Sequence, residues 1–220
     1  MGDVQDALLN LERFKNSNLT KRIAGLEQLL AGNNINGVKK ELGKEGITQS
    51  LLHAALVVKK ASSQIDVVVH ALGIMTALPY ILKQDEHVES LSLGAGSTGK
   101  AFDLETNMRI AEFKFIKWQG GSESIRQNQL FKDLFSLAAY ETTKERQLFL
   151  TGVEIPLRFL ATSNRSIKSA LSKNDAVKES FYAAYGDKYK TVSQYYHDVR
   201  SKVEIVDLSK LLPDVPFYGF

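Results

Sequence analysis

Residues 101–118 read AFDLETNMRIAEFKFIKW, and this stretch decides the fold that the sequence predicts. In residues 102–105 and 109–117, apolar side chains alternate with charged ones, a period of two that is typical of half-buried strands. The tripeptide TNM separates the two runs, and Asn is a common turn residue. The stretch therefore predicts a β-hairpin.

The predicted hairpin brings charged side chains together. A turn centred on the Asn-Met dipeptide places Asp103 directly opposite Glu112, on a face that also carries Glu105 and Lys114. The other face is apolar and carries Phe102, Leu104, Ala111, Phe113 and Phe115. Directly opposed side chains lie about 4.5–5.5 Å apart, where like charges are destabilising. Lys114 could relieve this repulsion in part and a hard divalent ion could do so better, while a solvated face with a cross-strand salt bridge is the structural alternative.

The segments around the hairpin predict an α/β fold. A helix, a strand, a second helix and a further strand are expected at residues 62–82, 88–93, 124–140 and 146–153. With the hairpin after the first of these strands, the order indicates a mixed central sheet flanked by helices. Residues 1–61 read as a helical N-terminal extension, and residues 62–220 as the α/β domain. The helix at 62–82 is apolar on nearly all sides, which predicts that it is largely buried.

The composition bears on the partners of the protein, on its cysteine chemistry and on its location. The 220 residues carry a formal net charge of +3, which permits a polyanionic partner without requiring one. The absence of cysteine excludes disulfides and thiol chemistry and fits a cytoplasmic protein. The acidic N-terminus does not resemble a signal peptide, and polar residues interrupt the longest apolar run, so no membrane span is expected. The helical N-terminus and the aromatic tail could provide contact surfaces for a homodimer.

A glycine-rich connection precedes the hairpin. Residues 94–100 read GAGSTGK and match the spacing of a phosphate-cradling loop. However, Ala101 stands where such loops place a Ser or Thr that holds Mg²⁺, and a strand is predicted where a helix should follow. A flexible connection between strands is the simpler interpretation, and nucleotide binding is a minor hypothesis.

Asp103, followed by Glu112-x-Lys114, resembles the motif of the PD-(D/E)XK nuclease superfamily, which has the restriction-endonuclease-like fold. In that family the Asp lies on the second core strand and the Glu-x-Lys on the third, and the predicted order of elements is similar. The resemblance covers fewer than half of the residues, and Phe102 replaces the Pro that many members place before the Asp. It implies a restriction-endonuclease-like core after the helical extension.

The resemblance also implies roles for these residues. Asp103 and Glu112 would ligate Mg²⁺ or Mn²⁺, helped by the main-chain carbonyl of Phe113. The ion would lower the pKa of a bound water and stabilise the pentavalent phosphate. Lys114 would orient the water or offset the developing charge.

Neighbouring elements could supply further site residues. The resemblance suggests an extra acid on the preceding helix, for which Asp66 is the candidate and Glu105 the rival. A buried pair between Asp66 and His70, four residues apart, is the structural alternative. Long polar side chains on the following helix could contact a phosphate, or could simply form its exposed side: Arg126, Gln127 and Gln129.

The expected function is therefore that of a metal-dependent nuclease, a phosphodiester hydrolase whose partner is nucleic acid, with DNA expected ahead of RNA. The alternative is a non-catalytic nucleic-acid-binding or regulatory protein on the same fold, in which the acids are kept as a structural or ion site.

Overall fold

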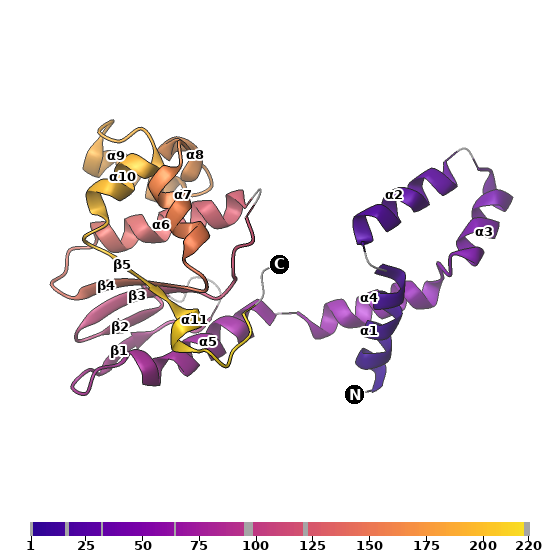
Figure 1. Ribbon diagram of the computed structural model, residues 1–220, viewed down its shortest axis with the longest axis horizontal. Coiled ribbons are helices and arrows are strands. Elements are labelled where there is room, and N and C mark those ends of the chain that lie inside the picture. The colour runs from indigo at the N-terminus through magenta and orange to yellow at the C-terminus, as the bar shows by residue number, and fades with distance from the viewer. Residues whose placement is uncertain are drawn as a thin grey trace. The chain divides into compact units, whose positions relative to one another are not determined.

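The computed structural model describes residues 2–15, 18–31, 33–63, 65–94, 99–120 and 123–217. The chain divides into two compact units, Met1–Ile65 and Asp66–Phe220 (Figure 1). The described part of the first unit is helical, and the second unit holds the sheet.

The N-terminal unit contains the helices α1 (Gly2–Lys15), α2 (Leu19–Leu30), α3 (Ile35–Lys44) and α4 (Gln49–Ala61). Asn18, Asn34 and Thr48 cap the last three, because their side-chain oxygens accept hydrogen bonds from first-turn amides. α1 packs against α4, where Ala7 and Ala54 are buried, but many leucines of this unit remain more than a third exposed. The predicted helical N-terminal region is confirmed, and the unit covers its own apolar residues poorly.

The second unit is built on a mixed sheet, as predicted, and this sheet has five strands. Its strands lie in the order β1 (Val88–Leu91), β2 (Leu104–Thr106), β3 (Arg109–Lys114), β4 (Glu145–Leu150) and β5 (Glu204–Asp207). β1 pairs with β2 and β2 pairs with β3 in antiparallel fashion, whereas β3, β4 and β5 run parallel. The helices of this unit are α5 (Ile65–Ile81), α6 (Ser124–Ala139), α7 (Glu154–Thr162), α8 (Ile167–Ala170), α9 (Asp175–Tyr185), α10 (Val192–Val199) and α11 (Leu208–Leu211).

The β2–β3 hairpin has the predicted register. Leu104 pairs with Ala111, and Glu105 pairs with Ile110, so the turn is centred on the Asn-Met dipeptide. Thr106 holds the turn closed, because its hydroxyl oxygen accepts hydrogen bonds from the backbone amides of Met108 and Arg109 at 3.0 and 2.8 Å. This register directs the side chains of Asp103 and Glu112 to the same face.

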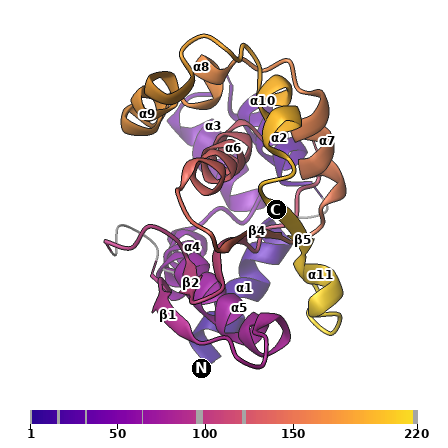
Figure 2. The same ribbon diagram turned by 90° about the vertical axis from the view of Figure 1, so that its left-hand side faces the viewer.

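Helices cover both faces of the sheet, with α6 to α10 on one side and α5 and α11 on the other (Figures 1 and 2). The α5 side packs Leu104, Ala111, Phe113 and Phe115 into one core, as predicted. Phe102 instead joins the core on the α6 side and packs its ring against Tyr140, because the chain bends before β2 begins and the alternation stops there.

Helix α5 is less buried than its composition predicts. Ile74, Ala77 and Ile81 pack on the sheet, whereas a stripe that includes Val68 and Leu72 is exposed. By length and composition alone, the stretch Gln49–Ile81, which includes a residue outside the described ranges, could cross a membrane, and only 18% of its most apolar window is buried. Core helices of soluble proteins also meet this criterion, and the second half of this stretch is a layer of the α/β unit.

A buried polar network fixes the turn end of the hairpin. The guanidinium of Arg109 binds both carboxylate oxygens of Glu86 and donates a 2.6 Å hydrogen bond to Gln147 on β4. Thr106 donates to the same carboxylate at 2.6 Å. Burial acts to raise the pKa of Glu86, but the hydrogen bonds from Arg109, Thr106 and Lys83 outweigh it and lower that pKa to about 2. The network therefore joins the loop before β1 to three strands.

Candidate active site

The carboxylate of Asp103 is held from two elements. One oxygen accepts a hydrogen bond of 2.9 Å from the backbone amide of Phe113, and the other lies 3.2 Å from Nε2 of His70 on α5. Burial acts to raise the pKa of Asp103, but the bond from His70, the charge of Lys114 and the Phe113 amide hold it below its ordinary value. Asp103 is therefore an ionised, oriented carboxylate.

Glu112 lies beside Asp103 on the neighbouring strand, in a strongly anionic setting. Its side chain is only 14% exposed. Burial, the carboxylate of Asp133 and that of Asp103 together raise the pKa of Glu112 to about 9, although Lys114 opposes them. Without a further cation, Glu112 holds a proton at neutral pH and shares a hydrogen bond with Asp103.

Lys114 lies among these acids. Its ammonium nitrogen is 2.9 Å from Oδ2 of Asp133 on α6 and 3.6 Å from Oε2 of Glu112. Burial acts to lower the pKa of Lys114, but the carboxylates of Asp133 and Glu112 outweigh it and hold that pKa above its ordinary value. Oδ2 of Asp133 makes no hydrogen bond of good geometry within the described part of the chain, so its contact with the ammonium is mainly electrostatic.

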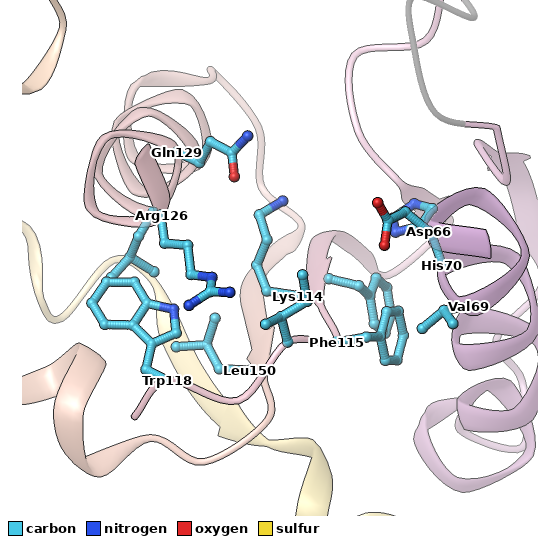
Figure 3. A pocket seen from close by; sticks show the side chains of 12 residues that line it. Asp66, Val69, His70, Lys114, Phe115, Trp118, Arg126, Gln129 and Leu150 are labelled. Atoms are coloured by element: carbon cyan, nitrogen blue, oxygen red, sulfur yellow. The ribbon is translucent and has the colours of Figure 1, made fainter. Parts of the chain in front are cut away.

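A cavity of about 170 Å³ opens at this end of the sheet, between α5 and α6. Figure 3 shows Lys114 in its centre, Gln129 and Arg126 extending from α6, and Asp66 and His70 on α5 opposite. Its floor is apolar and consists of Phe113, Phe115, Ile116, Trp118, Leu130 and Leu150. The cavity thus combines an apolar floor with charged groups that converge from both sides.

The structure brings Asp103, Glu112 and Lys114 together, as the hairpin register requires. It separates other candidates from them. Glu105 forms an ion pair of 2.8 Å with Lys144. Gln127 accepts a hydrogen bond of 2.8 Å from Arg165 and does not line the cavity.

Three candidates from the helices line the cavity: Asp66, Arg126 and Gln129. Arg126 is also engaged by Glu123, 2.8 Å away. The alternative of a buried Asp66–His70 pair is wrong, because Asp66 is exposed and His70 pairs with Asp103.

The sequence prediction of the site does not include Asp133, and it pairs His70 with Asp66 instead of Asp103. Asp133 is 5% exposed and is the nearest acid to the Lys114 ammonium. A signal was present, because Asp133 is the one charged residue on the buried side of α6, between Leu130 and Leu134. His70 was noticed for its spacing from Asp66, but its partner on the hairpin could be identified only in three dimensions.

The donor set suits a hard divalent ion. Within residues 65–94, 99–120 and 123–217, no group of three or more acidic or histidine side chains is arranged to hold a metal. Asp103 and Glu112 would therefore supply two carboxylates, and Mg²⁺ commonly binds through one or two carboxylates while it keeps several waters. The excess of buried negative charge around one lysine also favours a cation. Phe113, the expected source of a carbonyl ligand, is adjacent and donates its amide to Asp103.

Residues 95–98 of the glycine-rich connection lie outside the described residues. Lys100 donates its ammonium to the backbone carbonyl of Leu91. The chain then bends through residues 101–103 into β2 and forms no helix there, which agrees with the objection to a phosphate-cradling loop.

Comparisons with protein-family models, with curated proteins and with solved structures gave no match to this chain. Its function is therefore argued from the residues and geometry of the candidate site.

Proposed function

We propose that this chain is a metal-dependent nuclease that hydrolyses phosphodiester bonds, with DNA as the expected substrate, and that its α/β unit is a restriction-endonuclease-like core. One observation carries the proposal. The carboxylates of Asp103 and Glu112 lie side by side, and the ammonium of Lys114, a residue that lines the cavity, is 3.6 Å from Glu112.

The order of elements supports the proposed core. Helix α5 precedes three antiparallel strands, α6 follows, and β4 returns parallel to β3. Asp103 directly precedes the second strand, whereas Glu112 and Lys114 are on the third. The resemblance to the PD-(D/E)XK superfamily implies this strand for Glu112 and Lys114, and Asp103 lies one residue before the strand on which it implies the Asp.

Asp103 and Glu112 would hold Mg²⁺ or Mn²⁺, and such an ion supplies Lewis-acid stabilisation of a phosphate and activation of a water. Asp103 is already ionised and fixed by two hydrogen bonds, so it is prepared for this role. Glu112 must lose its proton when a cation binds beside it. Lys114 would offset charge on the phosphate, and such fixed electrostatic groups are worth about 10²–10³ in rate in other enzymes.

A cleavage assay with purified full-length protein tests the proposal. Wild-type protein should cut DNA when Mg²⁺ or Mn²⁺ is present and should stop when EDTA is added. Asp103→Asn and Lys114→Ala should each reduce the rate by about a hundredfold or more. Glu105→Gln is the matched control, because Glu105 lies on the same face but pairs with Lys144, and it should cut at the wild-type rate.

The proposal fails if the wild-type protein does not cut nucleic acid with either ion, or if the Asp103 and Lys114 variants cut as fast as the control. A crystal soaked in Mn²⁺ gives a second test, since an anomalous peak should lie beside residues 103 and 112.

One observation favours the alternative, a non-catalytic nucleic-acid-binding or regulatory protein. Lys114, the group expected to act on the phosphate, is engaged by Asp133 at 2.9 Å. If Asp133 retains the ammonium when nucleic acid binds, the acids act only as an ion site. Tight DNA binding without cleavage in either metal would support this alternative.

A further inference from the structure

A second cavity, of about 390 Å³, lies on the opposite side of the first turns of α6 from the candidate site. Its walls come from α6, from the end of α8 and from the connection that leads to α9. The residues that line it are Ser124, Ile125, Asn128, Gln129, Lys132, Arg165, Ala170, Leu171, Ser172, Lys173 and Asn174.

The lining of this cavity is basic. Lys132, Arg165 and Lys173 contribute three positive charges, and no Asp or Glu is among the residues that line it. Lys173 is exposed, and the side chain of Lys132 is 43% exposed with its nearest carboxylate, that of Asp133, 3.9 Å away. These ammonium groups are therefore available to an anion from solution.

Amide and hydroxyl groups accompany the cations. Asn128, Gln129 and Asn174 carry amides, and Ser124 and Ser172 carry hydroxyls. Within the described residues, Oδ1 of Asn128 and Nε of Arg165 are buried without a hydrogen-bond partner, so the lining is incompletely satisfied. Lysine and arginine charges combined with short polar side chains are the groups with which proteins contact the phosphates of nucleic acids.

The basic cavity is connected to the candidate site through Gln129. This residue lines both cavities, and Figure 3 shows its amide extending from α6 into the space above Lys114. A chain of phosphates that has one member at Asp103 and Glu112 could therefore continue past Gln129 to Lys132 and Lys173.

We propose that the basic cavity binds the phosphodiester backbone of a nucleic-acid strand next to the bond that is cut. This inference rests on the proposed nuclease function, since it makes the cavity part of the path of the substrate. The contacts are with phosphates, so binding should depend strongly on salt and little on base sequence.

The test measures the affinity of the full-length protein for a fluorescein-labelled DNA oligonucleotide by anisotropy, in EDTA and over a range of salt concentrations. The test variant is Lys132→Gln/Lys173→Gln. The control is Lys202→Gln/Lys210→Gln, which removes two exposed lysines near the two ends of β5 and changes the net charge equally. Each lost phosphate contact lowers the slope of log K against log salt by about 0.7–0.9.

The test variant should therefore show a slope smaller by about 1.4–1.8 and an affinity about tenfold weaker at moderate salt, while the control changes little. Equal affinities and slopes for the two double variants would overturn the inference, even if the wild-type protein cuts DNA. Loss of binding in the test variant alone, from a protein that never cuts with Mg²⁺ or Mn²⁺, would keep the binding site and refute the nuclease.

Inorganic phosphate and a mononucleotide, titrated separately, distinguish a strand from a small phosphate ligand. The inference expects the oligonucleotide to bind much more tightly than either. Mononucleotide binding as tight as oligonucleotide binding, and weakened by the Lys132/Lys173 substitutions, would overturn it.

Discussion

Glu112→Gln should stabilise the protein in the absence of metal, and the expected gain can be worked from the site. Glu112 is buried between Asp103 and Asp133, and this setting raises its pKa from 4.5 to about 9. At neutral pH, folding therefore requires the carboxyl to take up a proton that the unfolded chain has released. Glutamine has nearly the same shape and has no proton to take up.

The sign follows from the raised pKa. A carboxyl whose pKa is higher in the folded state contributes its full stability below pH 4.5 and loses it as the pH rises toward 9. Between pH 4.5 and pH 7 the loss accumulates at about 1.36 kcal/mol per pH unit. Wild-type protein should therefore be less stable than Glu112→Gln by up to about 3.4 kcal/mol at pH 7, with little difference near pH 4.5.

Urea unfolding in EDTA, followed by tryptophan fluorescence, measures this difference. The chain has one tryptophan, Trp118, which is buried in the α/β unit and lines the candidate site. Glu105→Gln is the control, because the partly solvated ion pair that it removes should be worth about 1 kcal/mol or less. If Glu112→Gln is no more stable than wild type at pH 7, and its advantage does not grow from pH 5 to pH 7, the reasoning about the buried acids is wrong.

Adding metal should reverse the order of stability. A ligand at about a thousand times its dissociation constant stabilises the folded state by about 4.1 kcal/mol, which exceeds the difference of up to about 3.4 kcal/mol expected without metal at pH 7. Mn²⁺ should therefore raise the urea midpoint of the wild-type protein and release a proton from Glu112, while it leaves Glu112→Gln nearly unchanged. Equal stabilisation of both proteins by Mn²⁺ would place the ion elsewhere.

Three further predictions use other parts of the α/β unit. Glu86→Gln should cost about 3–5 kcal/mol at pH 7 by urea unfolding, because it leaves Arg109 buried without a carboxylate. Wild-type protein should lose up to about 3 kcal/mol of this contribution as the pH falls from 4.5 toward 2, since the pKa of Glu86 is depressed. A free energy of unfolding that stays constant over this pH range would contradict this. Gly73→Ala should destabilise by about 1–3 kcal/mol in the same assay, because a Cβ there would lie 2.4 Å from the ring of Phe115; unchanged stability would show that the ring moves aside freely. Asp133→Asn should slow metal-dependent DNA cleavage by about 10–100-fold through loss of the lysine's partner, whereas faster cleavage would mean that Asp133 restrains the lysine.

The hairpin could be predicted because its signals are local. The alternation of apolar and charged residues predicted the two strands. The turn at the Asn-Met dipeptide predicted a register in which Leu104 pairs with Ala111. Since side chains alternate along each strand, that register also predicted that Asp103 and Glu112 share a face. The prediction was wrong at Phe102, which lies in a bend before β2 begins and packs into the other core.

The partners of the site could not be predicted in the same way, because they depend on how helices pack. The spacing of Asp66 and His70 indicated a pair, but His70 on α5 pairs with Asp103 of the hairpin. Apolar character around α5 predicted burial, yet Val68 and Leu72 are exposed. Hydrophobicity indicates which faces avoid water, but it does not identify the surface that covers them.

The number of charges separates the metal-site interpretation from the structural alternative. A solvated face with a cross-strand salt bridge would balance its charges or leave them in water. Here three carboxylates, those of Asp103, Glu112 and Asp133, cluster around the ammonium of Lys114 and are all largely shielded from solvent. The ammonium of Lys132, 3.9 Å from Asp133, is more exposed, and His70 lies beside Asp103. The raised pKa of Glu112 keeps this carboxyl protonated in the metal-free protein, which costs stability at neutral pH, and such costs are typical of sites that are kept for function. A divalent cation between Asp103 and Glu112 would remove the excess without that proton, and for this reason we interpret the cluster as a binding site.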